Sequence, residues 1–158
     1  MSVTDEIYQE LILHHSRRPR HYGPLPDATH AAAGDNPLCG DRYEVRLRVD
    51  EAGIIRDAAF EGSGCAISKA AASLMLDAVI GLSRDEFENQ FRLFHALVSG
   101  EAPSPEAAKK LGKLAAFSGI WKYPSRVKCA ILCWHAVHSA LIGQNRASTE
   151  GSSSPATV

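Results

Sequence analysis

The sequence predicts an α+β domain in which helices pack on one face of a small antiparallel sheet of three strands. Two observations lead to this prediction. Residues that alternate between apolar and polar gather early in the chain, between positions 31 and 61, whereas helical patterns dominate from position 66 onward. The length of 158 residues fits one domain, which we expect to span residues 1–146.

The first predicted element is an amphipathic helix near the N-terminus. It begins near Asp5, because acidic residues favour the first turn of a helix and apolar residues follow at helical spacing. It ends before Pro19, since proline disfavours helical backbone at the residue before it.

The sheet is predicted from the segment that follows. Strict alternation over residues 43–49 predicts a strand with one solvent-facing side. A turn at residues 50–53 leads into a second strand at 54–61. We expect a third strand, at the edge of the sheet, at residues 31–35.

Four helices are predicted after the sheet. Ser83 and Glu86 form a capping-box pair that opens the second of them, and Ser104 followed by Pro105 opens the third. The last helix is apolar on most sides, so we expect it to be largely buried. The four helices lie within residues 66–80, 83–100, 105–111 and 125–142.

The composition excludes several classes of protein. The formal net charge of -1 gives no electrostatic case for a nucleic-acid partner. The longest stretch without charged residues, 129–145, is too short and too polar to span a membrane. The acidic N-terminus lacks the apolar core of a signal peptide, so we expect a cytoplasmic protein. Residues 147–158 are rich in serine, and we expect them to form a flexible tail.

Four cysteines stand at positions 39, 65, 129 and 133. In a reducing cytoplasm they are not expected to form structural disulfides, which leaves core residues, reactive thiols or metal ligands. Cys133 lies one helical turn after Cys129 among large apolar residues, and this setting favours a core position for Cys133.

Cys39 and Asp41 are separated by Gly40, which allows an unusual backbone angle. A thiolate and a carboxylate could therefore point at one centre. The alternative is a turn with a capping aspartate and an incidental cysteine.

Cys65 follows two glycines and opens a predicted helix, where the helix dipole favours a thiolate. The alternative is a small buried residue at the point where strand meets helix. Cys129 lies in the first turn of the last helix, so the same dipole acts on it.

Three sulfurs and one oxygen, from Cys39, Asp41, Cys65 and Cys129, would suit zinc or an iron–sulfur cluster. Their spacing matches no zinc-finger pattern, so the residues alone leave the metal site as one alternative beside turn and core positions. Two further alternatives are a purely structural zinc site and a thiol hydrolase with Cys65 as its nucleophile.

Five sequence blocks, taken in order, resemble the U-type iron–sulfur cluster assembly family, the IscU/SufU or NifU N-terminal-like proteins. These blocks are residues 8–12 (YQELI), 18–20 (RPR), 35–41 (DNPLCGD), 60–68 (FEGSGCAIS) and 126–130 (RVKCA). The resemblance covers nearly the whole chain. It implies a sheet-and-helix domain with a metal site at one exposed end.

Two features of the resemblance separate the branches of this family. The IscU scaffold branch has histidine directly before the third cysteine, where this chain has Lys128. The SufU branch has lysine there and carries an additional segment, which residues 100–119 resemble. Both features point to the SufU branch, with an IscU-type scaffold that builds and hands on a cluster as the alternative.

The resemblance implies a sulfurtransferase-like carrier that acts with a SufS-type cysteine desulfurase and with downstream iron–sulfur assembly proteins. Carried over by position, Cys39 is the sulfur acceptor and Arg126 has a supporting role. Cys133 falls where the family does not require cysteine. The implied cofactor is Zn²⁺, with iron or an iron–sulfur cluster as the alternative, and the implied metal ligands are Cys39, Asp41, Cys65 and Cys129.

Overall fold

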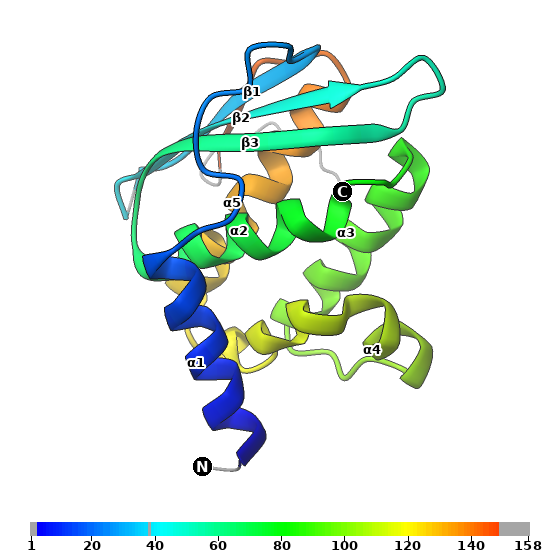
Figure 1. The fold of residues 1–158 in the computed structure, drawn as a ribbon. Coiled ribbons are helices and arrows are strands. Elements are labelled where there is room, and N and C mark those ends of the chain that lie inside the picture. Colours follow the sequence, from blue (N-terminus) through cyan, green and yellow to red (C-terminus); the bar gives the residue numbers. More distant parts are fainter. Residues whose placement is uncertain (1–2, 38, 149–158) are drawn as a thin grey trace.

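Three long strands and one short strand form the sheet of the computed structural model, which describes residues 3–37 and 39–148 (Figure 1). The strand order is β3-β2-β1-β4, and β1, β2 and β3 pair antiparallel. The strands are β1 (His30–Asn36), β2 (Asp41–Val49), β3 (Ile55–Ser63) and β4 (Arg146–Ser148). The predicted α+β class with its antiparallel three-stranded sheet is confirmed.

The short strand β4 corrects two expectations. It pairs parallel to β1 along Ala33–Asp35, so the predicted edge strand is covered on its outer side. Ala147 and Ser148, expected to begin a flexible tail, therefore continue the sheet through backbone pairing. The rest of the expected tail, residues 149–158, lies outside the described residues.

The helices lie on one face of the sheet (Figure 1). None of the helices in the described part of the chain is long and apolar enough to cross a membrane. Two 3-10 helices, η1 and η2, lie between α4 and α5, where the sequence predicted no element between residues 111 and 125. The helices are α1 (Val3–Arg17), α2 (Ala66–Val79), α3 (Arg84–Val98), α4 (Pro105–Leu111), η1 (Gly112–Phe117), η2 (Ile120–Lys122) and α5 (Pro124–Leu141).

The core lies between the sheet and α5. Alternate side chains of β2 point into it, because successive residues of a strand face opposite sides of the sheet. Trp134 of α5 is fully buried, and its ring stacks near those of Phe87, Phe91 and Phe94 on α3. The expectation that the last helix is largely buried is confirmed, and this packing fixes α5 beneath the sheet.

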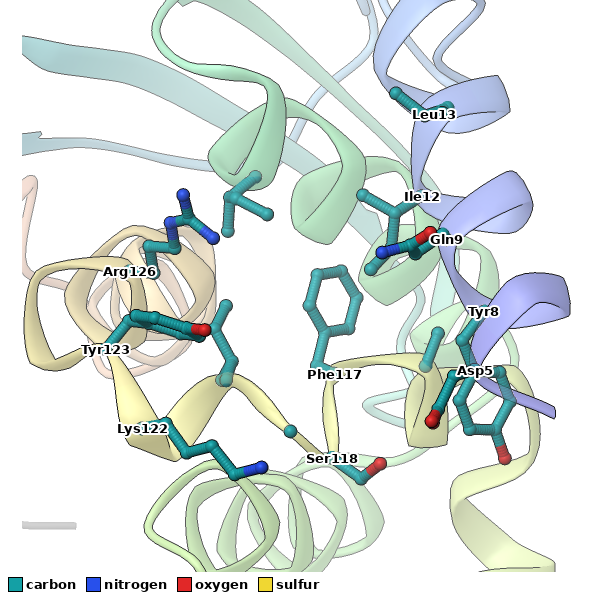
Figure 2. Close-up of a pocket in the computed structure, with 14 residues that line it drawn as sticks. Asp5, Tyr8, Gln9, Ile12, Leu13, Phe117, Ser118, Lys122, Tyr123 and Arg126 are labelled. Carbon is teal, nitrogen blue, oxygen red and sulfur yellow. The ribbon is translucent and has the colours of Figure 1, made fainter. Parts of the chain in front are cut away.

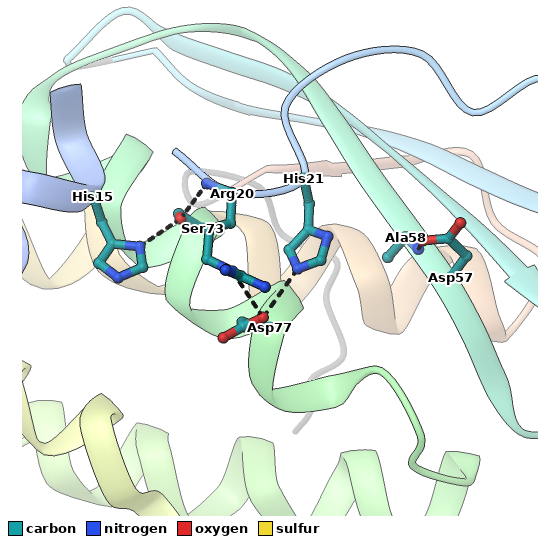
Figure 3. A network of polar contacts seen from close by, with 7 residues as sticks. All are labelled: His15, Arg20, His21, Asp57, Ala58, Ser73 and Asp77. Atoms are coloured by element: carbon teal, nitrogen blue, oxygen red, sulfur yellow. Dashed lines mark hydrogen bonds and ion pairs between the residues drawn. The ribbon is translucent and has the colours of Figure 1, made fainter. Parts of the chain in front are cut away.

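A polar network fixes the chain after α1 against α2 (Figure 3). The backbone N–H of Arg20 donates to Oγ of Ser73 at 2.7 Å, so the single hydroxyl proton of Ser73 is free to donate to Nδ1 of His15, also at 2.7 Å. Burial lowers the pKa of His15, consistent with a neutral ring that accepts this bond. Asp77 accepts from Arg20 and His21 in the same network. These bonds position α1 beside the start of the sheet.

Candidate metal centre

Three connections meet at the same end of the sheet (Figure 1). They are the turn from β1 to β2, the loop from β3 to α2, and the first turns of α5. Cys39 and Asp41 come from the first, Cys65 from the second, and Cys129 from the third. The fold therefore brings together residues that are far apart in sequence.

Cys39, Asp41 and Cys129 form a compact group of candidate ligands. Their two sulfurs and a carboxylate oxygen all lie within 4.8 Å of one another. Asp41 and Cys129 are buried, with 1% and 3% of their surface exposed, whereas Cys39 is exposed. Gly40 has a φ of +74°, the left-handed conformation that the tight turn between Cys39 and Asp41 requires.

Cys65 lies against this group and is joined to it by a backbone hydrogen bond. Its N–H donates to Oδ1 of Asp41 at 2.9 Å, and its thiol is near enough to that of Cys129 for each to shift the pKa of the other. Cys65 is also the N-cap of α2, because its sulfur accepts from the backbone N–H of Ser68 at 3.4 Å. All four residues singled out from the sequence are thus neighbours in the structure.

The pKa values of the Cys65 and Cys129 thiols are shifted in opposite directions. Interaction with the Cys129 thiol lowers the pKa of Cys65, with a further contribution from the N–H of Ser68. The same interaction raises the pKa of Cys129, and burial and the nearby Asp41 carboxylate raise it further. These directions favour the thiolate form at Cys65 over Cys129.

Gly64 makes the close approach of the β3–α2 loop possible. A Cβ at this position would lie 2.5 Å from Oδ1 of Asp41 and 2.5 Å from the hydroxyl of Tyr43. That hydroxyl is itself within 2.9 Å of Oγ of Ser68. A residue with a side chain would therefore push Asp41 and Cys65 apart.

Asn36, for which the sequence predicted no role, lies at the centre of the group. Its side chain is fully buried and donates to Oδ2 of Asp41 at 3.4 Å and to the Cys129 sulfur at 3.6 Å. One signal could have identified it. Alternation through the predicted strand at residues 31–35, extended by one residue, puts this polar side chain on the inward face with Ala32 and Gly34.

Cys133 and Arg126 stand apart from this group. Cys133 is 2% exposed within the apolar core, which confirms its predicted core position. The guanidinium of Arg126 lies 4.8 Å from the centroid of the Tyr123 ring. Among the described residues, no ion pair with a carboxylate holds Arg126 in place.

Arg126 lines a groove of about 650 Å³ between α1 and the segment from η1 to the start of α5. Figure 2 shows Arg126 and Tyr123 on one side of the groove and Gln9 and Ile12 of α1 on the other. Ile67, two residues after Cys65, also lines the groove. The groove therefore begins beside the candidate metal centre.

The donor set fits a tetrahedral metal ion. Zinc–sulfur bonds of about 2.3 Å would set neighbouring sulfurs roughly 3.8 Å apart, a separation compatible with the compact group. The Cys65 sulfur is not among the atoms within 4.8 Å of one another, although the Cys65 backbone is hydrogen-bonded to Asp41. Thiolates and a carboxylate suit zinc and also suit iron, so the residues could hold either metal.

Comparison with known proteins relates the chain to one family. Residues 7–130 match the family model described as the NifU-like N terminal domain. The iron-sulfur cluster assembly scaffold protein IscU of Streptococcus pyogenes serotype M1 is 38% identical over 141 residues, which cover 89% of this chain and 86% of that protein. The zinc-dependent sulfurtransferase SufU of Bacillus subtilis (strain 168) is 34% identical over 137 residues, covering 87% of this chain and 90% of that protein.

A solved structure shows the same fold. It is described as a candidate iron-sulfur cluster assembly scaffold protein for the SUF system, from Fervidobacterium islandicum AW-1. It superposes with a TM-score of 0.78 at 31% identity, covering 86% of this chain and 97% of that one.

Proposed function

The chain belongs to the family of NifU-like N-terminal domains, the IscU/SufU proteins of iron–sulfur cluster assembly, and we propose that it is a zinc-binding sulfur acceptor within that family. In this role it takes persulfide sulfur from a cysteine desulfurase. The observation that carries the proposal is the compact group of Cys39, Asp41 and Cys129, with the backbone N–H of Cys65 hydrogen-bonded to Asp41.

Cys39 is the proposed sulfur acceptor because it is exposed and because no hydrogen bond to its sulfur is found among the described residues. The Cys65 sulfur accepts a hydrogen bond from the backbone N–H of Ser68, and the Cys129 sulfur accepts one from the side chain of Asn36. Within residues 3–37 and 39–148 no hydrogen bond to the Cys39 sulfur is found, and the residue lies on an exposed turn. Its sulfur can therefore meet a partner with little rearrangement of the rest.

The transfer is an exchange at sulfur. The Cys39 thiolate attacks the terminal sulfur of the desulfurase persulfide, a new S–S bond forms on Cys39, and the old S–S bond breaks. The electron pair of the broken bond leaves with the desulfurase cysteine as a thiolate, so no external oxidant or reductant is needed. Bound zinc would keep the cysteines deprotonated and protect them from oxidation.

Arg126 and the adjoining groove support a role in partner contact. The guanidinium stacks on an exposed tyrosine beside the centre, where it could meet a carboxylate of a SufS-type desulfurase. Transfer to downstream iron–sulfur assembly proteins would follow from the same exposed end. Free thiols persist best in a reducing cytoplasm, where we propose that the protein acts.

A scaffold role is the second candidate, and a specific observation favours it. The relative from Streptococcus pyogenes carries the scaffold name at 38% identity. Lys128 favours the carrier, because the scaffold branch has histidine at the position before the third cysteine. Metal content separates the two: one colourless zinc ion supports the carrier, whereas a stable brown cluster that passes to an apo-protein supports the scaffold.

The direct test is to mix the purified protein with a SufS-type desulfurase and cysteine, and then to locate the added sulfur by mass spectrometry. We expect the mass of one sulfur atom on the peptide that contains Cys39. Cys39→Ser should abolish the addition, whereas the matched control Cys133→Ala should retain it. Sulfur on another residue of the wild-type protein, or on the Cys39→Ser variant, would refute the assignment.

A further inference from the structure

Asn36, three residues before Cys39 in the DNPLCGD block, contacts three of the candidate ligands. Its backbone carbonyl accepts the N–H of Cys39 at 3.2 Å and that of Gly40 at 2.9 Å. Its side-chain amide reaches Asp41 and Cys129 on the other side. It is the last residue of β1, in register with Asp41, the first residue of β2.

The chemistry of the neighbours fixes which end of the amide faces them. A carboxylate only accepts hydrogen bonds, so the NH₂ end of Asn36 must point at Asp41. The two N–H groups of that end can serve two acceptors, here Oδ2 of Asp41 and the sulfur of Cys129. Full burial of the amide means that these bonds are not replaced by water.

The carboxylate of Asp41 is held from both sides. The backbone N–H of Cys65 donates to Oδ1 at 2.9 Å, and the side-chain amide of Asn36 donates to Oδ2. Its plane is therefore set by one backbone donor from the β3–α2 loop and one side-chain donor from β1. Groups of this kind, which orient ligands without binding the metal, are a general feature of protein metal sites.

We propose that Asn36 is the positioning residue of the metal centre, orienting the Asp41 carboxylate and the Cys129 sulfur for the ion. This inference rests on the proposed zinc site. Three thiolates, one carboxylate and a divalent ion carry a net charge of -2, and the two N–H dipoles of Asn36 offset part of it without adding a charge.

The arrangement also distinguishes Cys39 from the other ligands. Asn36 holds Cys39 through the backbone turn, and its side chain contacts those of Asp41 and Cys129. When the Cys39 sulfur is modified, the amide bonds to the other two stay in place. Asn36 would therefore keep the remaining ligands assembled during sulfur transfer.

Three variants test the proposal in a graded series. Asn36→Asp keeps the shape of the side chain, removes both N–H donors and adds a charge beside Asp41. Asn36→Ser keeps one shorter donor. Asn89→Asp is the matched control, because Asn89 lies on α3 and bonds only to the nearby Arg92 among the interactions found in the described residues.

The readouts are the zinc affinity, measured by competition with a chromophoric chelator, and the absorption spectrum of the Co²⁺-loaded protein. Removing such an orienting residue typically lowers metal affinity by about 10- to 100-fold. We expect a loss in that range for Asn36→Asp, a smaller loss for Asn36→Ser, and wild-type affinity for Asn89→Asp. The sulfur-to-cobalt absorption should change in the Asn36 variants alone.

Several outcomes decide the matter. If both Asn36 variants have the zinc affinity and the Co²⁺ spectrum of wild type, the proposal is overturned. The proposed zinc site would still stand in that case. Wild-type protein that binds no zinc would instead overturn the proposed function and this inference with it. If Asn36→Asp fails to fold by circular dichroism, Asn36→Ser decides alone, and an unchanged affinity in that variant counts against the proposal.

Discussion

The backbone N–H of Cys65 donates a 2.9 Å hydrogen bond to Oδ1 of Asp41. This bond joins the N-terminus of α2 to the start of β2, so the loop after β3 must pass very close to the Asp41 carboxylate. The residue that makes this approach possible is Gly64, directly before Cys65. The metal centre therefore depends on a position that contributes no side chain.

Gly64→Ala should disrupt the centre through overpacking. The new Cβ would lie 2.5 Å from Oδ1 of Asp41 and 2.6 Å from Oγ of Ser68, well inside contact distance. We expect the variant to be about 1–3 kcal/mol less stable, the usual range when a packed site must shift. Zinc stoichiometry should fall in parallel. Urea unfolding and metal analysis of the purified variant measure the two effects.

Gly119→Ala is the matched control for this substitution. Gly119 has a φ of -91°, which alanine adopts readily, and an added Cβ would meet nothing within 4 Å. Stability and zinc content of Gly119→Ala should stay at wild-type values. A Gly64→Ala protein that is indistinguishable from Gly119→Ala would show that the close approach at Cys65 is not required.

Substitution of Cys129 should abolish the stabilisation of the protein by zinc, whereas substitution of Cys133 should not. Both are buried on α5, one turn apart, but only Cys129 belongs to the compact group. A ligand that binds only the folded state adds about 2.7 kcal/mol of stability at a free concentration 100 times its Kd. Zinc should therefore raise the Tm of wild type and of Cys133→Ala. In Cys129→Ala the zinc-induced rise should vanish.

The two variants also separate metal binding from packing. Cys133→Ala should lose about 1 kcal/mol of stability with zinc absent, because it removes a buried side chain from the core. Differential scanning fluorimetry with a chelator and with added zinc measures both effects. A full zinc-induced shift in Cys129→Ala would remove Cys129 from the ligand set.

The positions of the main helices and strands, and the residues of the candidate centre, could be read from the sequence. Alternation over residues 43–49 is a local property of the chain, and β2 follows it closely. The capping box of Ser83 and Glu86 is local too, and both of its hydrogen bonds are present. Because such patterns depend on a few neighbouring residues, the local structure that they predict does not depend on how the rest of the chain folds.

Features that depend on long-range pairing could not be read in the same way. Strand β4 has three residues, too few for a periodic pattern, and it exists because Asn145 and its neighbours meet β1. The role of Asn36 depends on the register that sets it opposite Asp41 and on the approach of Cys129. Neither the pairing of β4 with β1 nor the approach of Cys129 to Asn36 is encoded within a short window of sequence.

Ser73→Ala should loosen α1 without affecting the distant helix α3. The substitution leaves the N–H of Arg20 without its acceptor and Nδ1 of His15 without its donor. Loss of such buried bonds typically costs about 1–3 kcal/mol. We expect faster amide hydrogen exchange in residues 3–23, measured by mass spectrometry.

Ser83→Ala provides the comparison for this prediction. It removes the N-cap of α3 and should cost about 1 kcal/mol. Its effect on exchange should be confined to α3. Equal acceleration in α1 for both variants would mean that global destabilisation, rather than the bonds of Ser73, controls exchange there.

His135 should make the folded protein sensitive to mild acid. Burial, with smaller contributions from His95 and His138, lowers its pKa from 6.5 to about 4. Above pH 6.5 the ring is neutral in both states and adds no pH dependence. As the pH falls below 6.5 the unfolded state takes up a proton that the folded state refuses until about pH 4. Stability is therefore lost across this window, by about 2 kcal/mol at pH 5.

Urea unfolding at pH 7.5 and pH 5 tests this loss, with a chelator present so that metal release does not add to it. His135→Gln cannot take up the proton, so its stability should fall by about 2 kcal/mol less than that of wild type. His14→Gln, at an exposed position of α1, should keep the wild-type dependence. Because buried His15 contributes in the same direction, some loss should remain in His135→Gln. A pH dependence of His135→Gln equal to that of wild type would mean that the ring is protonated within the fold at pH 5.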